Sequence, residues 1–304
     1  MSLPPTSLIV CTRNRHGFVR ALVESILAGE QVPTEILVVD QSDAPDPQLA
    51  AAEPARGCEI VYRLSRTRGA SAARNEGIGA ARTDLLVFVD DDVLVTPTWL
   101  VRLVSSVVDR GPRSVVTGQV RAGEPEVAGG FAPSLITDEQ PTVYEGRVGN
   151  DILFSGNMAM FRGAVDEVGL FDERIGPGTR RFPGGGEDND FCYRLLEAGY
   201  RIVYEPRAVI YHRAWRAPDD YVRLRWRYGR GQGGFYGKHL GLRDRHVLWR
   251  LTRDSGSLCW RLLRDAPRRP RVAAGHAAFL VGLLSAVVEW TITQRVRQGS
   301  GGSR

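Results

Sequence analysis

A run of apolar residues that ends in three consecutive aspartates constrains this chain more than any other feature. Residues 85–89 are apolar and include two β-branched valines, so they predict a buried strand, and Asp90, Asp91 and Asp92 follow it directly. Three adjacent carboxylates repel one another and cannot be buried without a compensating positive charge. Hard divalent ions such as Mg²⁺ or Mn²⁺ bind a few carboxylates together with the phosphate oxygens of a substrate. The run therefore predicts a cation site, although an acidic turn that merely faces solvent is the alternative.

Strands and helices are predicted to alternate along the first 110 residues. Apolar runs at residues 7–11, 35–40 and 59–64 predict further strands, and helical spacing of apolar residues predicts helices between them. One helix is expected over residues 69–82 with Ser71 as its cap, and another with Thr96 as its cap and Pro97 at its first position. This alternation is typical of a doubly wound α/β sheet with mostly parallel strands. Ligands bind such sheets outside the carboxyl ends of the strands, which is where the aspartate triplet falls.

Cysteine usage and the amino terminus suggest an intracellular protein. The four cysteines are widely spaced and form no Cys-x-x-Cys pair, which argues against a zinc finger and against a disulfide framework. The first residues lack the charged and apolar pattern of a signal peptide. We therefore expect a cytoplasmic protein.

Charge is distributed unevenly along the 304 residues. Residues 1–200 contain 19 basic and 28 acidic residues, whereas residues 201–304 contain 21 basic and 7 acidic residues, a net charge of +14. A basic end of this kind predicts an anionic partner, such as phosphate groups or acidic lipid headgroups. No helix-turn-helix, zinc-finger or aromatic RNA-binding signature accompanies the charge, so we expect no nucleic-acid partner.

Several motifs, taken in order, resemble the family 2 glycosyltransferases of the GT-A fold. Asp40 at a strand end, Arg-Gly-Ala-Ser-Ala-Ala-Arg-Asn at residues 68–75 and the aspartate triplet match the nucleotide-sugar half of that family. Residues 156–162, 168–173 and 186–194 resemble its acceptor-side segments. The resemblance implies a GT-A domain over residues 1–215, with a nucleotide-sugar-binding half at about 1–121 and an acceptor and catalytic half at about 122–215. Residues 216–304 would form a basic, amphipathic or hydrophobic helical extension.

The same resemblance implies an activity and a donor site. The activity is the metal-dependent, inverting transfer of a hexosyl or deoxyhexosyl group from a nucleotide diphosphate donor, UDP- or dTDP-linked, to a hydroxyl of a glycan or lipid-linked acceptor, as in polysaccharide biosynthesis. The metal is Mn²⁺ or Mg²⁺, held by Asp90, Asp92 and His212. Contacts with the nucleotide sugar are implied for six residues: Thr12, Arg13, Asp40, Arg68, Asp90 and Asp91. Arg68 would also fit a surface position at a helix start, and His212 a structural histidine.

Acceptor-side roles are implied for the second half of the domain. By resemblance Asp188 is the general base, which takes the proton from the attacking hydroxyl. Acceptor contacts are implied for Asn157, Glu187, Asp190 and Trp215. The preceding Pro-Gly-Gly-Gly at residues 183–186 suits a mobile rim. The alternatives are acidic residues that complement a helix dipole and, for Trp215, a buried core tryptophan.

The last ninety residues combine arginine, tryptophan and leucine. This mixture predicts a helix that lies on an anionic membrane surface, so we expect a peripheral protein at the cytoplasmic face of the membrane. Residues 272–288 are apolar apart from His276 and Ser285, which is at the lower limit for a spanning helix. The alternative is an ordinary apolar helix packed on the protein or on a second subunit of a homodimer.

Two other classes of protein compete with the transferase. A haloacid-dehalogenase-like phosphatase also has a strand followed by Asp-x-Asp, with Asp90 as nucleophile and Asp92 as acid. That fold needs a lysine before a second acidic cluster, whereas the only lysine, Lys238, follows residues 187–190. A non-catalytic membrane-surface binding protein would use the basic end alone.

Overall fold

The computed structural model describes residues 3–241 and 243–300, and the chain divides into two compact units. The first unit contains Met1–Phe171 and Phe191–Arg216, and the second contains Asp172–Asp190 and Ala217–Arg304. This division differs from the predicted domains, because residues 172–190 group with the carboxyl-terminal helices rather than with the sheet. Residues 301–304, the end of the predicted extension, lie outside the described residues.

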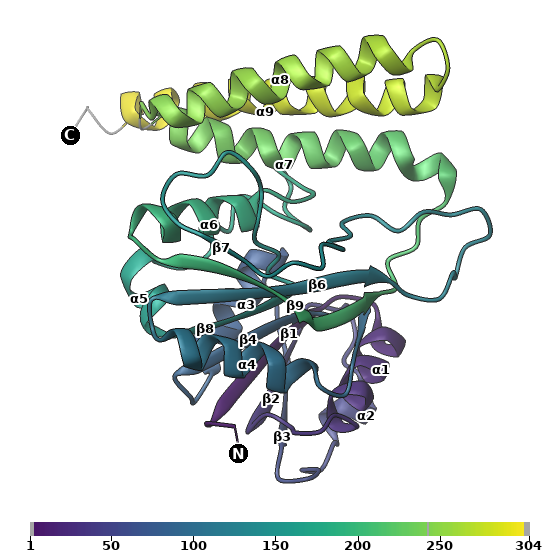
Figure 1. The fold of residues 1–304 in the computed structure, drawn as a ribbon, viewed down its shortest axis with the longest axis vertical. Coiled ribbons are helices and arrows are strands. Elements are labelled where there is room, and N and C mark those ends of the chain that lie inside the picture. The colour runs from purple at the N-terminus through teal and green to yellow at the C-terminus, as the bar shows by residue number, and fades with distance from the viewer. Residues whose placement is uncertain (1–2, 242, 301–304) are drawn as a thin grey trace. The chain divides into compact units, whose positions relative to one another are not determined.

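A mixed β-sheet forms the centre of the first unit (Figure 1). Its strands, in chain order, are β1 (Thr6–Thr12), β2 (Glu35–Asp40), β3 (Glu59–Leu64), β4 (Leu85–Asp90), β5 (Val93–Val95), β6 (Ser114–Ala122), β7 (Thr142–Tyr144), β8 (Asn157–Phe161) and β9 (Arg201–His212). Across the sheet the order is β3-β2-β1-β4-β8-β6-β9-β5, and β7 also pairs with β9. The first four strands are mutually parallel, as predicted, whereas β8 runs antiparallel to β4 and β6. The carboxyl ends of β1, β2 and β4 therefore lie at one edge of the sheet.

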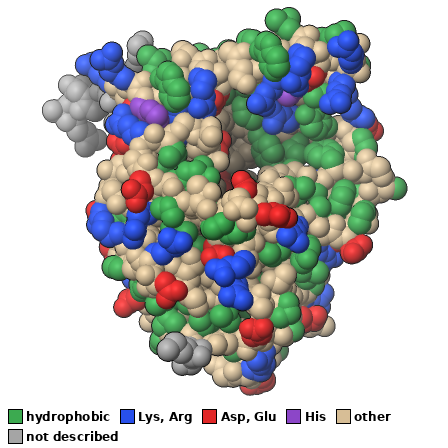
Figure 2. Space-filling view, in the orientation of Figure 1, with side chains coloured by type: hydrophobic (Ala, Val, Ile, Leu, Met, Phe, Trp, Pro, Cys, Tyr) green, Lys and Arg blue, Asp and Glu red, His purple; other side chains and the backbone are tan. Residues whose placement is uncertain are grey.

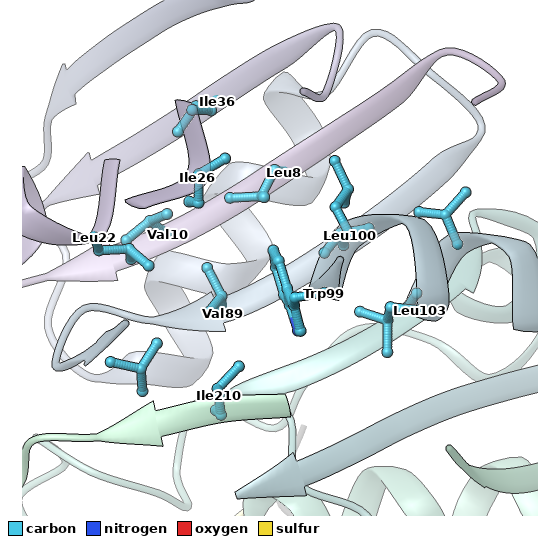
Figure 3. Close-up of a cluster of buried hydrophobic side chains, with 14 of the residues drawn as sticks. Leu8, Val10, Leu22, Ile26, Ile36, Val89, Trp99, Leu100, Leu103 and Ile210 are labelled. Atoms are coloured by element: carbon cyan, nitrogen blue, oxygen red, sulfur yellow. The ribbon is translucent and has the colours of Figure 1, made fainter. Parts of the chain in front are cut away.

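Helices cover both faces of this sheet. They are α1 (His16–Leu27), α2 (Pro47–Ala50), α3 (Ala70–Ala80), α4 (Trp99–Arg110), α5 (Gly163–Val168) and, from Phe191 onward, α6 (Glu187–Glu197). Side chains alternate between the faces with the period of a strand. Leu8 and Val10 of β1 pack with α1 and α4 (Figure 3), whereas Ile9 packs with α3, α5 and α6. Burial on both faces explains why these strands are almost continuously apolar.

Two predicted helix starts are wrong by a few residues. The helix expected after Thr96-Pro97 begins at Trp99, and its cap is Thr98. Ser71 lies inside α3, whose cap is Gly69, because the positive φ of 99° at that glycine turns the chain before the helix begins.

Long helices dominate the second unit. After a short 3₁₀ turn, η1 (Pro218–Asp220), come α7 (Tyr221–Gly241), α8 (Arg245–Asp265) and α9 (Pro270–Ser300), and α9 packs against both α7 and α8. Glycines permit the crossing of α7 and α9: a Cβ atom on Gly229 would lie 2.1 Å from the carbonyl oxygen of Phe279, and one on Gly233 would lie 2.3 Å from that of Leu283. The two backbones therefore touch directly, as at the small-residue interfaces of closely packed helices.

We predict that Gly233→Ala destabilises the protein, because its methyl group would push α7 away from α9. Overpacking of this kind costs about 1–3 kcal/mol in the free energy of unfolding, measured by urea denaturation. Gly256→Ala in α8 is the matched control, since a Cβ atom there meets nothing within 4 Å and alanine favours a helix by about 1 kcal/mol. Equal stability of the two variants would contradict the close crossing.

Candidate active site

Arginine supplies much of the positive charge that the aspartate triplet requires. Asp91 and Asp92 are each only 6% exposed, and one guanidinium nitrogen of Arg15 lies 3.0 Å from Asp91 Oδ1 and 2.7 Å from Asp92 Oδ2. Arg15 immediately precedes α1, and β1 is the neighbour of β4 in the sheet. The Thr12 hydroxyl at the end of β1 donates a 2.7 Å hydrogen bond to Asp91. Adjacent parallel strands thus bring these residues together.

The last two residues of the segment at residues 68–75 contact the triplet and the backbone near it in the fold. Arg74 is buried in α3 and lies 3.1 Å from Asp90 Oδ1. Asn75 exchanges two hydrogen bonds with the backbone of Phe171, at 2.9 and 3.0 Å. Arg68 is exposed just before the helix. The segment therefore supplies a counter-charge to the triplet and fixes the chain where the acceptor-side segment begins.

His212 lies beside Asp92 because β5 and β9 pair. The register of these antiparallel strands sets His212 opposite Val93, the residue after the triplet. The His212 Nε2 atom is 3.3 Å from Asp92 Oδ1, and Nδ1 is 3.2 Å from the carbonyl oxygen of Pro133. A carbonyl can only accept, so Nδ1 carries a proton and Nε2 is directed at the carboxylate. Metal-binding histidines are commonly oriented by such a carbonyl.

Burial and charge give the neighbouring carboxyls different proton affinities. Burial, together with repulsion from Asp92, raises the pKa of Asp91. Burial acts in the same direction on Asp92, but the hydrogen bond and charge of His212, with help from Arg15, outweigh it and lower the pKa of Asp92. Asp92 therefore remains ionised and is the better cation ligand of the two.

The donor set around Asp92 fits a divalent ion. Adjacent ligands of an octahedral ion with bonds of about 2.1 Å lie roughly 3 Å apart, close to the separation of Asp92 Oδ1 and His212 Nε2. Within residues 3–241 and 243–300, no three His, Cys, Asp or Glu side chains are already arranged around one point. Asp90, the third predicted ligand, points toward Arg74. Asp92 and His212 could thus hold an ion whose other ligands come from substrate and water.

Other predicted site residues, on the donor and the acceptor side, lie in contrasting environments. Asp40 is fully buried and accepts hydrogen bonds from Ser42 and from the Tyr62 hydroxyl, the latter at 2.6 Å. His16 lies 3.3 Å from the same carboxylate. Arg13 Nε and Trp215 Nε1, in contrast, are buried donors for which the described part of the chain offers no acceptor. Buried donors are rarely left without a partner, so these two nitrogens are suited to a ligand.

Asn157 does not have the geometry predicted for it. Its side chain is fully buried, its oxygen accepts a 2.8 Å hydrogen bond from the Trp99 indole, and its amide donates to the backbone oxygens of Gln119 and Ala208. These bonds tie β8 to α4, β6 and β9. The side chain therefore holds the sheet together and is not directed at an acceptor.

The acidic first turn of α6 belongs to the second unit and differs residue by residue. Glu187 and Asp190 are buried, whereas Asp188 between them is partly exposed. Asp190 lies 2.7 Å from Lys238 Nζ and 2.9 Å from His239 Nε2 of α7. Of the three carboxylates, Asp188 is the one whose exposure suits contact with a substrate.

Sequence patterns alone did not identify Arg15 and Lys238. Arg15 follows a strand that ends at the same edge as the triplet, which was a usable signal. Lys238 carries no such signal, because its partners Asp172 and Asp190 are brought to it by the packing of a loop on α7.

Comparison with known proteins identifies the family. The model of "Glycosyl transferase family 2" matches residues 7–169. A protein of Mycobacterium tuberculosis described as "Pre-mycofactocin glycosyltransferase" is 30% identical over 73% of this chain, and the match spans 46% of that relative. This chain thus corresponds to about half the length of that curated relative.

Solved structures resemble the fold. The mannosyltransferase PcManGT from Pyrobaculum calidifontis, in complex with GDP-Man and Mn²⁺, aligns with a TM-score of 0.61 at 14% identity, over 94% of this chain and 88% of its own. Residues 1–349 of S. aureus TarS, in complex with UDP-GlcNAc, align with a TM-score of 0.53 at 15% identity, over 93% and 91% of the two chains. These likenesses confirm the predicted GT-A fold.

The family match also removes the haloacid-dehalogenase-like phosphatase as an alternative. The motifs at Asp40, residues 68–75 and Asp90–Asp92 lie within the matched region, in the order that the resemblance required. The chain belongs to glycosyl transferase family 2.

Proposed function

We propose that the chain is a metal-dependent, inverting glycosyltransferase that moves a sugar from a UDP- or dTDP-linked donor to a hydroxyl of a glycan or lipid-linked acceptor. The observation that carries this proposal is the grouping of Asp92 and His212, 3.3 Å apart, at the carboxyl end of β4. Family membership and the nucleotide-sugar complexes of two structural neighbours support it.

Donor binding would use the edge of the sheet in the first unit. A divalent ion held by Asp92 and His212 would neutralise the charge that grows on the diphosphate leaving group. Arg13 would donate a hydrogen bond to the nucleotide through its Nε atom, because that donor has no acceptor among the side chains described, those of residues 3–241 and 243–293. Thr12, Asp40 and the exposed Arg68 would contact the nucleotide from the same edge. Asp90 would lie near the ribose and the metal, and Asp91 would contact the nucleotide sugar.

Asp188 would act on the acceptor. As the acceptor oxygen bonds to the anomeric carbon, the bond from that carbon to the phosphate oxygen breaks, and Asp188 takes the hydroxyl proton. The nucleoside diphosphate leaves from the opposite side, so the anomeric configuration inverts. Trp215 and Glu187 would help to bind the acceptor substrate. The buried indole N–H of Trp215 has no hydrogen-bond partner in the described part of the chain, so it could donate to that substrate.

The helices α8 and α9 would hold the enzyme at the cytoplasmic face of a membrane. Trp260 and Leu263 of α8 are 60% and 75% exposed, and Arg264 stacks over the Trp260 ring at 4.8 Å. Figure 2 shows basic side chains, which on α8 and α9 are arginines, interspersed with hydrophobic ones over these helices. By length and composition Pro270–Thr293 could also cross a membrane. The mean hydropathy of its most apolar stretch of 18 residues is 1.8, and 33% of that stretch is buried. Each arginine near an anionic leaflet contributes about 1 kcal/mol, so a few arginines together with a buried apolar face would suffice for reversible attachment.

We predict that Asp92→Asn weakens Mn²⁺ binding, measured by calorimetry, and lowers sugar transfer at least about 10²-fold, since a charged ligand of the cation is lost. Asp109→Asn is the matched control, because Asp109 is an exposed carboxylate on α4. Full transfer in excess chelator would rule out the metal.

For Asp188→Asn we expect donor binding close to that of the parent but transfer lowered about 10²–10⁴-fold, because an amide cannot accept the proton. Asp166→Asn serves as the control, as an exposed carboxylate in the first turn of another helix, α5. Retention of the donor's anomeric configuration in the product would contradict direct displacement.

The double variant Trp260→Ser, Leu263→Ser is expected to lose salt-sensitive sedimentation with anionic liposomes, because the apolar surface that enters the interface is gone. Leu64→Ser is the control, since Leu64 is an exposed leucine on β3. If the parent does not sediment and instead forms a dimer that the double variant abolishes, these helices are a subunit interface.

A further inference from the structure

Lys238 is the only lysine of the chain, and it joins two carboxylates that are far apart in sequence. Its Nζ atom lies 3.0 Å from Asp172 Oδ2 and 2.7 Å from Asp190 Oδ1, and its side chain is 19% exposed. Asp172 and Asp190 are the first and last residues of the loop segment that groups with the helices of the second unit. One ammonium group therefore closes this segment at both ends.

The burial of Asp190 makes this contact costly to lose. The side chain is 0% exposed, and His239 Nε2 lies 2.9 Å from the same oxygen that Lys238 contacts. A buried carboxylate that loses one charged partner destabilises its surroundings strongly. Arg174 and Lys238 likewise overcome the effect of burial and hold the pKa of Asp172 well below its usual range. Both ends of the segment are thus fixed as ion pairs.

Two further contacts bracket Asp188 on the same surface of α7. Gly186 has a φ of 94°, and a Cβ atom there would lie 2.3 Å from the carbonyl oxygen of Gly231, so the loop backbone rests directly on α7. The side chain of Asn189 donates a hydrogen bond to Gln232. Contacts before and after Asp188 therefore set its backbone position, while its own side chain remains partly exposed.

We propose that Lys238 is a positioning residue: by pairing with Asp172 and Asp190 it fixes the first turn of α6 and so the direction of the Asp188 carboxylate. This inference rests on the proposed role of Asp188 as general base. Lys238 touches neither substrate in this account and acts only through the carboxylates that it joins. It also assigns Asp190 to the support of the base, in place of the acceptor contact predicted for it.

Steady-state kinetics of full-length variants test the proposal. Lys238→Met should lower kcat at least about 10-fold, because displacement of a catalytic group by about 1 Å can cost up to about 10²-fold, while KM for the nucleotide sugar stays within about twofold. Lys238→Arg should recover most of the loss, since a guanidinium can also bridge two carboxylates. Arg223→Gln is the matched control: Arg223 is an exposed cation of the same helix that pairs with Asp220. Asp188→Asn is measured alongside.

Hydrogen exchange provides a readout independent of turnover. Amides of residues 184–190 should exchange faster in Lys238→Met than in the parent, but not in Asp188→Asn or Arg223→Gln. Unchanged exchange, parent-like kcat in Lys238→Met, or failure of Lys238→Arg to restore kcat would each overturn the positioning role. Full transfer by Asp188→Asn would instead overturn the base assignment, and the exchange result would still decide whether Lys238 fixes the segment.

Discussion

The buried carboxylates at the end of β4 set the strongest constraint on this fold. Asp91 and Asp92 can be buried because Arg15 bridges them, Thr12 donates to one and His212 contacts the other. The Arg15 side chain is 38% exposed, so solvent weakens its ion pairs, but its loss would still leave two buried carboxylates without their shared counter-charge. Thr12 ends β1, Arg15 follows it closely, and His212 ends β9, so the pairing of β1 with β4 and of β9 with β5 brings these partners to the triplet.

The same charge balance bears on the proposed binding of a divalent ion at this edge of the sheet. Arg15 and Arg74 offset part of the negative charge of the triplet. A divalent ion would reverse the sign of the remaining charge and so hold an anionic diphosphate, which a site fully neutralised by arginine would bind less well. The lowered pKa of Asp92 and the orientation of His212 by Pro133 fit this role.

Local patterns revealed the elements of the sheet but not the contacts between distant ones. Strand β2 has the predicted limits, because a continuous apolar run bounded by polar residues specifies a buried strand. Strand β3 has the predicted limits as well, although it lies at the edge of the sheet and is partly exposed. The approach of His212 to Asp92 depends on antiparallel pairing between β5 and β9, which no local period encodes. The burial of Asn157 was missed for the same reason, since its partners lie on β6, β9 and α4.

The glycines of α7 show that the carboxyl-terminal helices also support the loop before Asp188. Each glycine inside a helix costs about 0.5–1 kcal/mol relative to alanine, so this helix is weak by composition. Gly229, Gly233 and Gly237 face α9, whereas Gly231 and Gly234 face the loop at residues 182–186. Only burial against both neighbours offsets that cost. A chain that ended before α9 would therefore lose the packing that keeps α7 helical, and with it the surface on which the loop before Asp188 rests.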